Sequence, residues 1–131
     1  FADGIRLGGV DVRPDPAQPG GALLVSLFWR PETTPAARYT VFSHLIDADG
    51  KLVAQFDGEP AGGTAPTTTW QPGATVVDRR AIPLPVDLPP GRYTLRVGMY
   101  SQPGLQRLAV AAAPGPVVDN AAQVAEVTVS P

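Results

Sequence analysis

Cysteine is absent from this 131-residue chain, and histidine and lysine each occur once. The lack of cysteine excludes disulfide bonds, thiolate metal ligands and a cysteine nucleophile. No apolar run approaches the roughly 18 residues that a membrane-spanning helix requires, so no spanning segment is predicted. The formal net charge is only -2, with both signs mixed along the chain. Such a balance argues against nucleic acid or an anionic membrane surface as a partner.

Proline and glycine, by contrast, are abundant, with 16 and 14 residues. Both disfavour helix interiors, so many short strands joined by turns are predicted instead of long helices. Hydrophobic residues make up 44% of the chain, which is ordinary for a globular domain with its own core. We therefore expect residues 1–131 to form a single domain. Because the chain starts at Phe1 and shows no signal peptide, we expect it to be a domain cut from a longer protein or a processed form.

The clearest strand signal runs from Tyr93 to Tyr100. Alternate residues are apolar, and the intervening ones are polar or glycine, which is the period of a half-buried strand. The preceding Pro89-Pro90-Gly91 turn places Tyr93 as in the tyrosine corner of immunoglobulin-like domains, where the ring is buried and its hydroxyl bonds to the backbone. With turn signals along the rest of the chain, the pattern predicts an all-β, immunoglobulin-like antiparallel β-sandwich of about seven to nine strands.

Other strands are predicted over residues 5–12, 22–30, 39–46, 52–57, 76–86, 106–110 and 121–129. A bulge at Gly8-Gly9 would bring the apolar residues of the first strand onto one face. Residues 47–50 would join the third and fourth strands as a hairpin. Pro83 and Pro85 remove two N–H donors on one side, so this strand should lie at a sheet edge or leave the sheet, with Ile82, Leu84 and Val86 facing inward. Residues 111–120 are predicted to be a loop.

No catalytic set is predicted. A hydrolase would use Ser43 as nucleophile, His44 as base and Asp57 as orienting group. Adjacent strand residues point to opposite faces, so Ser43 and His44 cannot meet on a regular strand. We expect His44 to be partly buried and hydrogen-bonded across the hairpin. The Asp47-x-Asp49-Gly50 segment lacks the calcium-loop spacing and is interpreted as a turn, so neither a metal nor a cofactor is predicted.

Candidate ligand-binding residues surround the long irregular segment from Gly58 to Ala74. Trp70 lies in this polar loop, where its ring could stack on a sugar or could close one end of the sandwich. Asp57 and Asp78 flank the segment and could close it by accepting backbone N–H groups, or bind a cation with loop carbonyls. His44 and Gln55, on the two arms of the hairpin, complete the set of candidates.

Several segments together resemble the soluble C-terminal β-sandwich domain of bacterial multi-pass membrane proteins of the glycosyltransferase-like, mannosyltransferase type. The likeness covers nearly the whole chain and rests on the following segments: Phe1–Leu7, Tyr39–Gly50, Leu52–Asp57, Trp70–Gly73, Val77-Asp78, Leu88–Tyr100 and Gln106–Leu108. In that family the transfer chemistry belongs to the membrane region, so no catalytic residue carries over. The family often has an aspartate after the strand-ending tyrosine, whereas Ser101 follows Tyr100 here.

The resemblance implies a non-catalytic, extracytoplasmic accessory domain attached to a membrane glycosyltransferase-like protein. Its expected partners are a glycan or the membrane region of the parent protein, without insertion of this segment into the membrane. An alternative is a structural or protein-interaction module that has no small-molecule ligand and pairs through an exposed strand edge.

Overall fold

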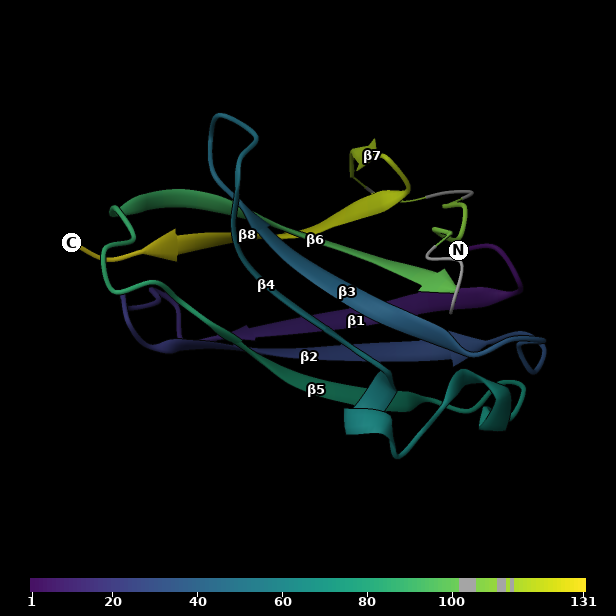
Figure 1. Cartoon of the computed structure of the whole chain (residues 1–131). Helices are drawn as coiled ribbons and strands as arrows, with labels where there is room; N and C mark the ends of the chain where they lie inside the picture. Colours follow the sequence, from purple (N-terminus) through teal and green to yellow (C-terminus); the bar gives the residue numbers. More distant parts are fainter. Residues whose placement is uncertain (102–105, 111–112, 114) are drawn as a thin grey trace.

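The computed structural model describes residues 1–101, 106–110, 113 and 115–131, which form eight strands in two packed antiparallel sheets (Figure 1). The first sheet contains, in spatial order, β1 (Ile5–Arg13), β2 (Ala22–Pro31) and β5 (Val76–Pro83). The second contains β4 (Leu52–Gly58), β3 (Tyr39–Ile46), β6 (Gly91–Ser101), β8 (Ala121–Val129) and β7 (Val117–Val118). The prediction of an all-β sandwich is confirmed.

Two short 3₁₀ helices, η1 (Pro60–Gly63) and η2 (Thr67–Thr69), lie in the long segment between β4 and β5. Among the described residues, no helix is long and apolar enough to span a membrane. The segment packs beside β5, at the side where β4 and β5 form the edges of the two sheets (Figure 1).

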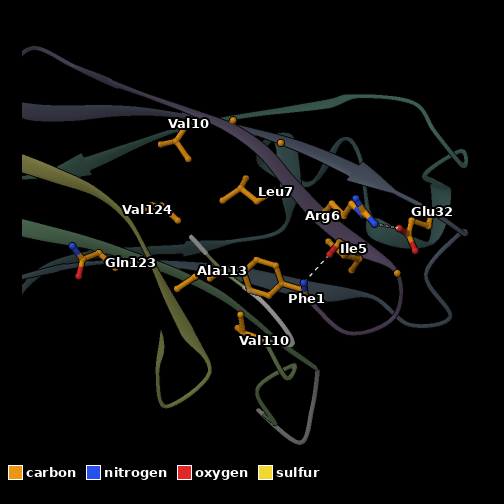
Figure 2. Close-up of a pocket in the computed structure, with 14 residues that line it drawn as sticks. Phe1, Ile5, Arg6, Leu7, Val10, Glu32, Val110, Ala113, Gln123 and Val124 are labelled. Atoms are coloured by element: carbon orange, nitrogen blue, oxygen red, sulfur yellow. Dashed lines mark hydrogen bonds and ion pairs between the residues drawn. The ribbon is translucent and has the colours of Figure 1, made fainter. Parts of the chain in front are cut away.

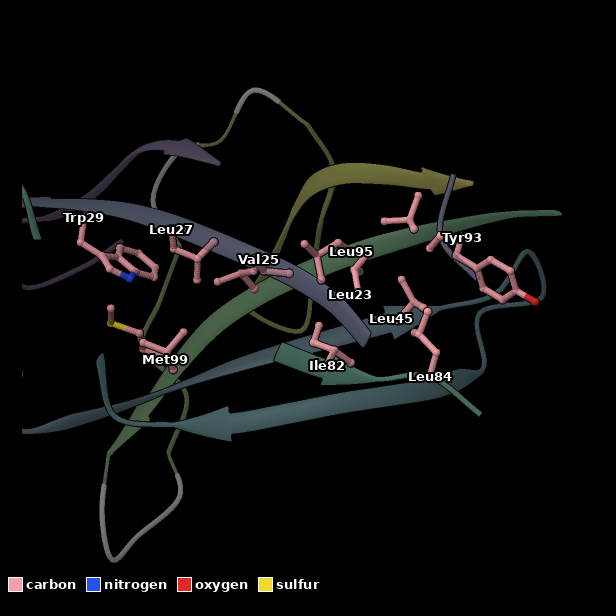
Figure 3. Packing of buried hydrophobic residues seen from close by; sticks show 14 of the residues in the cluster. Leu23, Val25, Leu27, Trp29, Leu45, Ile82, Leu84, Tyr93, Leu95 and Met99 are labelled. Atoms are coloured by element: carbon pink, nitrogen blue, oxygen red, sulfur yellow. The ribbon is translucent and has the colours of Figure 1, made fainter. Parts of the chain in front are cut away.

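The core lies between the sheets, as the alternation of apolar residues predicts (Figure 3). Leu23, Val25, Leu27 and Trp29 of β2 are at most 1% exposed and face the apolar residues of β6. The burial of each of the three aliphatic side chains in this set stabilises the folded state by about 1.5–3 kcal/mol. The Tyr93 hydroxyl donates to the Pro89 carbonyl at 2.6 Å, so the expected tyrosine corner is present.

Local turn chemistry also agrees with the sequence. The β1–β2 register shifts between Leu7 and Gly9, and this bulge keeps the apolar residues of β1 on the inner face. The β3–β4 hairpin closes through Gly50, whose φ of 83° lies in the left-handed region that glycine tolerates. β5 is an edge strand that ends at Pro83, as its prolines predict.

Three predictions about segments were wrong or incomplete. Val86 is 85% exposed and does not face inward, because the chain leaves the sheet after Pro83. Gln106–Val110 is not a strand, since only Arg107 forms an isolated bridge, with Tyr100. The expected loop 111–120 contains β7, which pairs with β8 through a turn with positive φ at Asp119 and Asn120. The Ser101-Gln-Pro-Gly segment of the sequence also predicts a turn, but residues 102–104 lie outside the described part of the chain.

Candidate functional site

Three of the predicted ligand-binding residues, His44, Gln55 and Asp57, come together on the outer face of the five-stranded sheet. The β3–β4 register places Gln55 opposite His44 and Asp57 opposite Phe42. These positions alternate with the core-facing residues of β3, so their side chains point away from the core. With the neighbours contributed by β6 and residues 106–110 they form what we call the outer-face cluster: Phe42, His44, Gln55, Asp57, Arg96, Tyr100 and Arg107.

The floor of the outer-face cluster is aromatic. Phe42 is 1% exposed although it faces away from the core, because other side chains cover it. The Tyr100 ring stacks beside it with a centroid distance of 6.3 Å, and the guanidinium carbon of Arg107 lies 4.4 Å from the Phe42 ring centroid. Arg107 Nη1 also donates to the Asp119 carbonyl at 2.8 Å. The Arg107 side chain is therefore held over the ring.

Gly98 makes this packing possible. It lies opposite Phe42 in the β3–β6 register. A Cβ atom at position 98 would overlap the Phe42 ring and lie 2.9 Å from the Asn120 carbonyl oxygen, so a larger residue would displace the ring. A glycine inside a strand often marks such a close approach. It was the sequence signal that could have revealed Phe42 as part of a site.

The polar rim centres on Asp57. Its Oδ2 accepts a hydrogen bond from the Tyr100 hydroxyl at 3.1 Å, and its Oδ1 lies 3.8 Å from His44 Nε2. Burial and the bond to Asp57 raise the pKa of Tyr100, so the hydroxyl remains a donor at neutral pH. Gln55 is exposed beside His44. The rim therefore offers a carboxylate, an imidazole, an amide and guanidinium groups within one small area.

The His44 side chain is only 17% exposed, and its burial lowers the pKa of the imidazole below 6.5. The nearby Asp57 carboxylate opposes this shift, whereas Arg107 and Arg96 reinforce it. Because the folded-state pKa is depressed, the unfolded chain binds a proton more readily, so His44 reduces stability as the pH falls through 6.5.

We expect an NMR titration of His44, which is the sole histidine, to show a midpoint below 6.5. Asp57→Asn should lower this midpoint further because it removes a favourable charge. Arg96→Gln should raise it because it removes a like charge. A wild-type midpoint at or above 6.5 would contradict the buried, cation-flanked position of the ring.

Asp78 lies elsewhere, between the two sheets. Its Oδ2 forms an ion pair with Arg80 Nη2 at 2.6 Å, and each side chain is 1% exposed. Trp29 Nε1 donates to the same oxygen at 3.3 Å, and the Ala61 backbone N–H donates to Oδ1 at 3.0 Å. The bond from Ala61 anchors η1. Asp78 therefore closes the long segment by accepting a backbone N–H, which was one of its two predicted roles. Its burial and existing partners remove it from the surface-binding candidates.

Arg80 connects Asp78 to the opposite sheet. Its Nη1 donates to the Val41 carbonyl at 2.8 Å and to Ser43 Oγ at 3.2 Å, and its Nη2 donates to the Gly58 carbonyl at 3.2 Å. Burial lowers the pKa of Arg80, and the adjacent Asp78 opposes that shift. The pair thus joins β5 to β3 and β4 through the interior.

Trp70 is 2% exposed, so the open stacking platform considered for it is wrong. Its ring stacks on Trp29 with centroids 6.2 Å apart, and its Nε1 donates to the Ala65 carbonyl at 2.9 Å. Apolar contact with the core and a satisfied N–H make this burial favourable. Trp70 closes one end of the core, which was the alternative interpretation.

The hydrolase arrangement does not assemble. Ser43 is fully buried on the inner face, where its Oγ accepts from Arg80, whereas His44 lies on the outer face beside Asp57. The two residues are adjacent on β3 and point in opposite directions. Within the described part of the chain, no group of three or more His, Cys, Asp or Glu residues could hold a metal ion.

A cleft, which sequence reasoning missed, opens between β1 and β8 (Figure 2). This cleft has a volume of about 710 Å³. Its lining combines apolar side chains, among them Leu7, Val10, Val110 and Val124, with polar surface, and the Arg6–Glu32 ion pair lies at its rim. The flanking β1 is an edge strand of its sheet. The cleft therefore offers both apolar contact and polar groups to a ligand.

Comparison with solved structures finds proteins that share the fold. The chain matches the C-terminal domain of Wzt with a TM-score of 0.65 and 13% identity, over 98% of this chain and 74% of that chain. It matches a β-glucuronidase from glycoside hydrolase family 2 with a TM-score of 0.53 and 11% identity, over 76% of this chain and 10% of that chain. At such identities the likeness shows a common β-sandwich fold. Neither a protein-family model nor a curated protein sequence matches the chain.

Proposed function

We propose that this is a non-catalytic accessory domain, located outside the cytoplasm on a membrane glycosyltransferase-like protein, and that it contacts glycan through the outer-face cluster. The observation that carries the proposal is that planar polar side chains gather around the partly exposed Tyr100 ring, which stacks on the buried Phe42 ring, on the outer face of one sheet. Binding sites for small polar ligands combine apolar contact with a few placed polar groups in this way.

The chemistry of the outer-face cluster suits a sugar. A pyranose ring presents hydroxyl groups around its edge and C–H groups on its faces. The Asp57 carboxylate can accept hydrogen bonds from neighbouring hydroxyls, and the Gln55 amide can both donate and accept. The exposed parts of the Tyr100 ring can contact the C–H face. Asp57 is already oriented by Tyr100, so less rotamer freedom is lost on binding.

Two further observations support the proposal. The chain resembles the soluble domain of mannosyltransferase-type membrane proteins over nearly its whole length. One of the solved structures that share the fold, over 76% of this chain and 10% of that one, is a β-glucuronidase from glycoside hydrolase family 2.

Calorimetric titration with a panel of neutral and acidic oligosaccharides tests this function. We expect saturable binding to at least one member, weakened about 3- to 10-fold by Gln55→Ala, the loss expected for one hydrogen bond of about 1 kcal/mol. Gln18→Ala replaces an exposed glutamine outside the outer-face cluster and should leave the affinity unchanged. A panel without any binder, or equal losses in the two variants, would count against glycan contact at this face.

The cleft between β1 and β8 favours a second candidate function, a protein-interaction module. An extended segment of a partner could add to the free edge of β1 and place alternate apolar side chains in the cleft. Val10→Lys would then abolish association with the remainder of the parent protein in a co-purification assay while leaving glycan titrations unaffected. Retained association in this variant would exclude docking at the cleft.

A further inference from the structure

The nine arginines of this chain fall into three groups. Five of the nine form an ion pair with a carboxylate: Arg6, Arg13, Arg38, Arg80 and Arg92. Arg30 and Arg79 are exposed on the three-stranded sheet. The remaining two, Arg96 and Arg107, both belong to the outer-face cluster, and neither has a carboxylate partner within the described ranges.

Arg96 is the less satisfied of the two. It is half-buried on β6 directly opposite His44. Among the described residues, none accepts a hydrogen bond from its guanidinium or forms an ion pair with it. Arg107 has one bond, to the Asp119 carbonyl, and lies over Phe42. The charges of both act on the His44 imidazole, so the two guanidinium groups lie near the same point of the sheet surface.

The local charge is therefore opposite in sign to that of the whole chain. The outer-face cluster contains two guanidinium groups and a single carboxylate, Asp57, which already accepts from Tyr100. The chain as a whole has a formal charge of -2. Guanidinium groups match carboxylate and phosphate oxygens in shape as well as charge, because their N–H donors form a planar fork. Arg107 is held in place by Phe42 and Asp119, which reduces the entropy lost when it binds an anion.

We propose that the glycan recognised by the outer-face cluster carries an anionic group, a carboxylate or a phosphate ester, which pairs with Arg96 and Arg107. This inference rests on the proposed glycan-binding function and specifies its ligand class. The sugar hydroxyls bind Asp57 and Gln55, and the anionic substituent lies toward β6. Neutral glycans of the same shape bind more weakly because they leave the cationic side of the cluster without a partner.

Two matched pairs of probes test this by calorimetry on the full chain: oligogalacturonate against its methyl ester, and mannose 6-phosphate against mannose. We expect at least one anionic probe to bind 10-fold or more tightly than its neutral counterpart. Arg96→Gln should lower the affinity for the anionic probe to that for the neutral probe. Arg96→Lys should recover part of the lost affinity. The matched control is Arg79→Gln, an exposed arginine on the other sheet, which should change neither affinity.

The outcomes separate this inference from the proposed function. If anionic and neutral probes bind with equal affinity and Arg96→Gln changes neither affinity, the proposed anionic specificity is wrong. The proposed glycan binding would remain. Absence of binding to all four probes and to the broader glycan panel would overturn both. The first probe pair reports on a carboxylate and the second on a phosphate ester. A bound anion should also raise the pKa of His44 in the NMR titration, which a neutral glycan would not do.

Discussion

Arg80→Met is expected to lower the free energy of unfolding by about 3–5 kcal/mol, the cost typical of removing one member of a buried ion pair. The variant would leave the Asp78 carboxylate charged and desolvated between the sheets, with both side chains of the native pair only 1% exposed. It would also leave the Val41 and Gly58 carbonyls without the donors that Arg80 supplies. Chemical denaturation monitored by tryptophan fluorescence measures the loss.

The adjacent arginine provides the control. Arg79 lies next to Arg80 on β5 but is exposed, so Arg79→Met should change stability by less than about 0.5 kcal/mol. In a double-mutant cycle, Asp78→Asn combined with Arg80→Met should cost clearly less than the sum of the single variants, because the lone buried charge disappears. Additive losses, or similar losses at positions 79 and 80, would show that the pair is not coupled in the interior.

Sequence patterns predicted those features of the fold that depend on residues close together along the chain. The tyrosine corner, the Gly8-Gly9 bulge and the Gly50 turn each follow from local backbone preferences, and all three are present. The β3–β4 hairpin also fixed the proximity of His44 to Asp57, since a short turn determines which residues lie opposite one another.

Features that depend on distant pairing were not predictable. Arg96 and Tyr100 join His44 only because β6 pairs with β3, about fifty residues away along the chain, and no local signal specifies that pairing. The ion pair of Asp78 and Arg80 was missed for a related reason. Their parity matches that of the inward-facing Ile82, but charged residues are almost never fully buried unless paired, and the partner interactions become visible only in the folded structure.

Trp70→Ala is expected to destabilise the domain by about 3–5 kcal/mol, as large-to-small replacements in a core do. The substitution removes the contact with Trp29 and leaves a cavity at the end of the core. Trp70→Phe keeps most of the apolar volume and loses the hydrogen bond to the Ala65 carbonyl, so a smaller loss of about 1–3 kcal/mol is expected. Denaturation curves of the two variants give these values directly.

The same variants distinguish a structural tryptophan from a ligand-binding one. A residue that closes the core should affect stability while the affinity of the folded protein for glycan remains unchanged, because the ring has no face open to a ligand. Trp70→Phe should therefore bind the glycan panel like the wild type under conditions in which it is fully folded. Lost binding without lost stability would mean that a glycan reaches Trp70 after all, and would move the binding surface from the outer face of β3, β4 and β6 to the end of the sandwich.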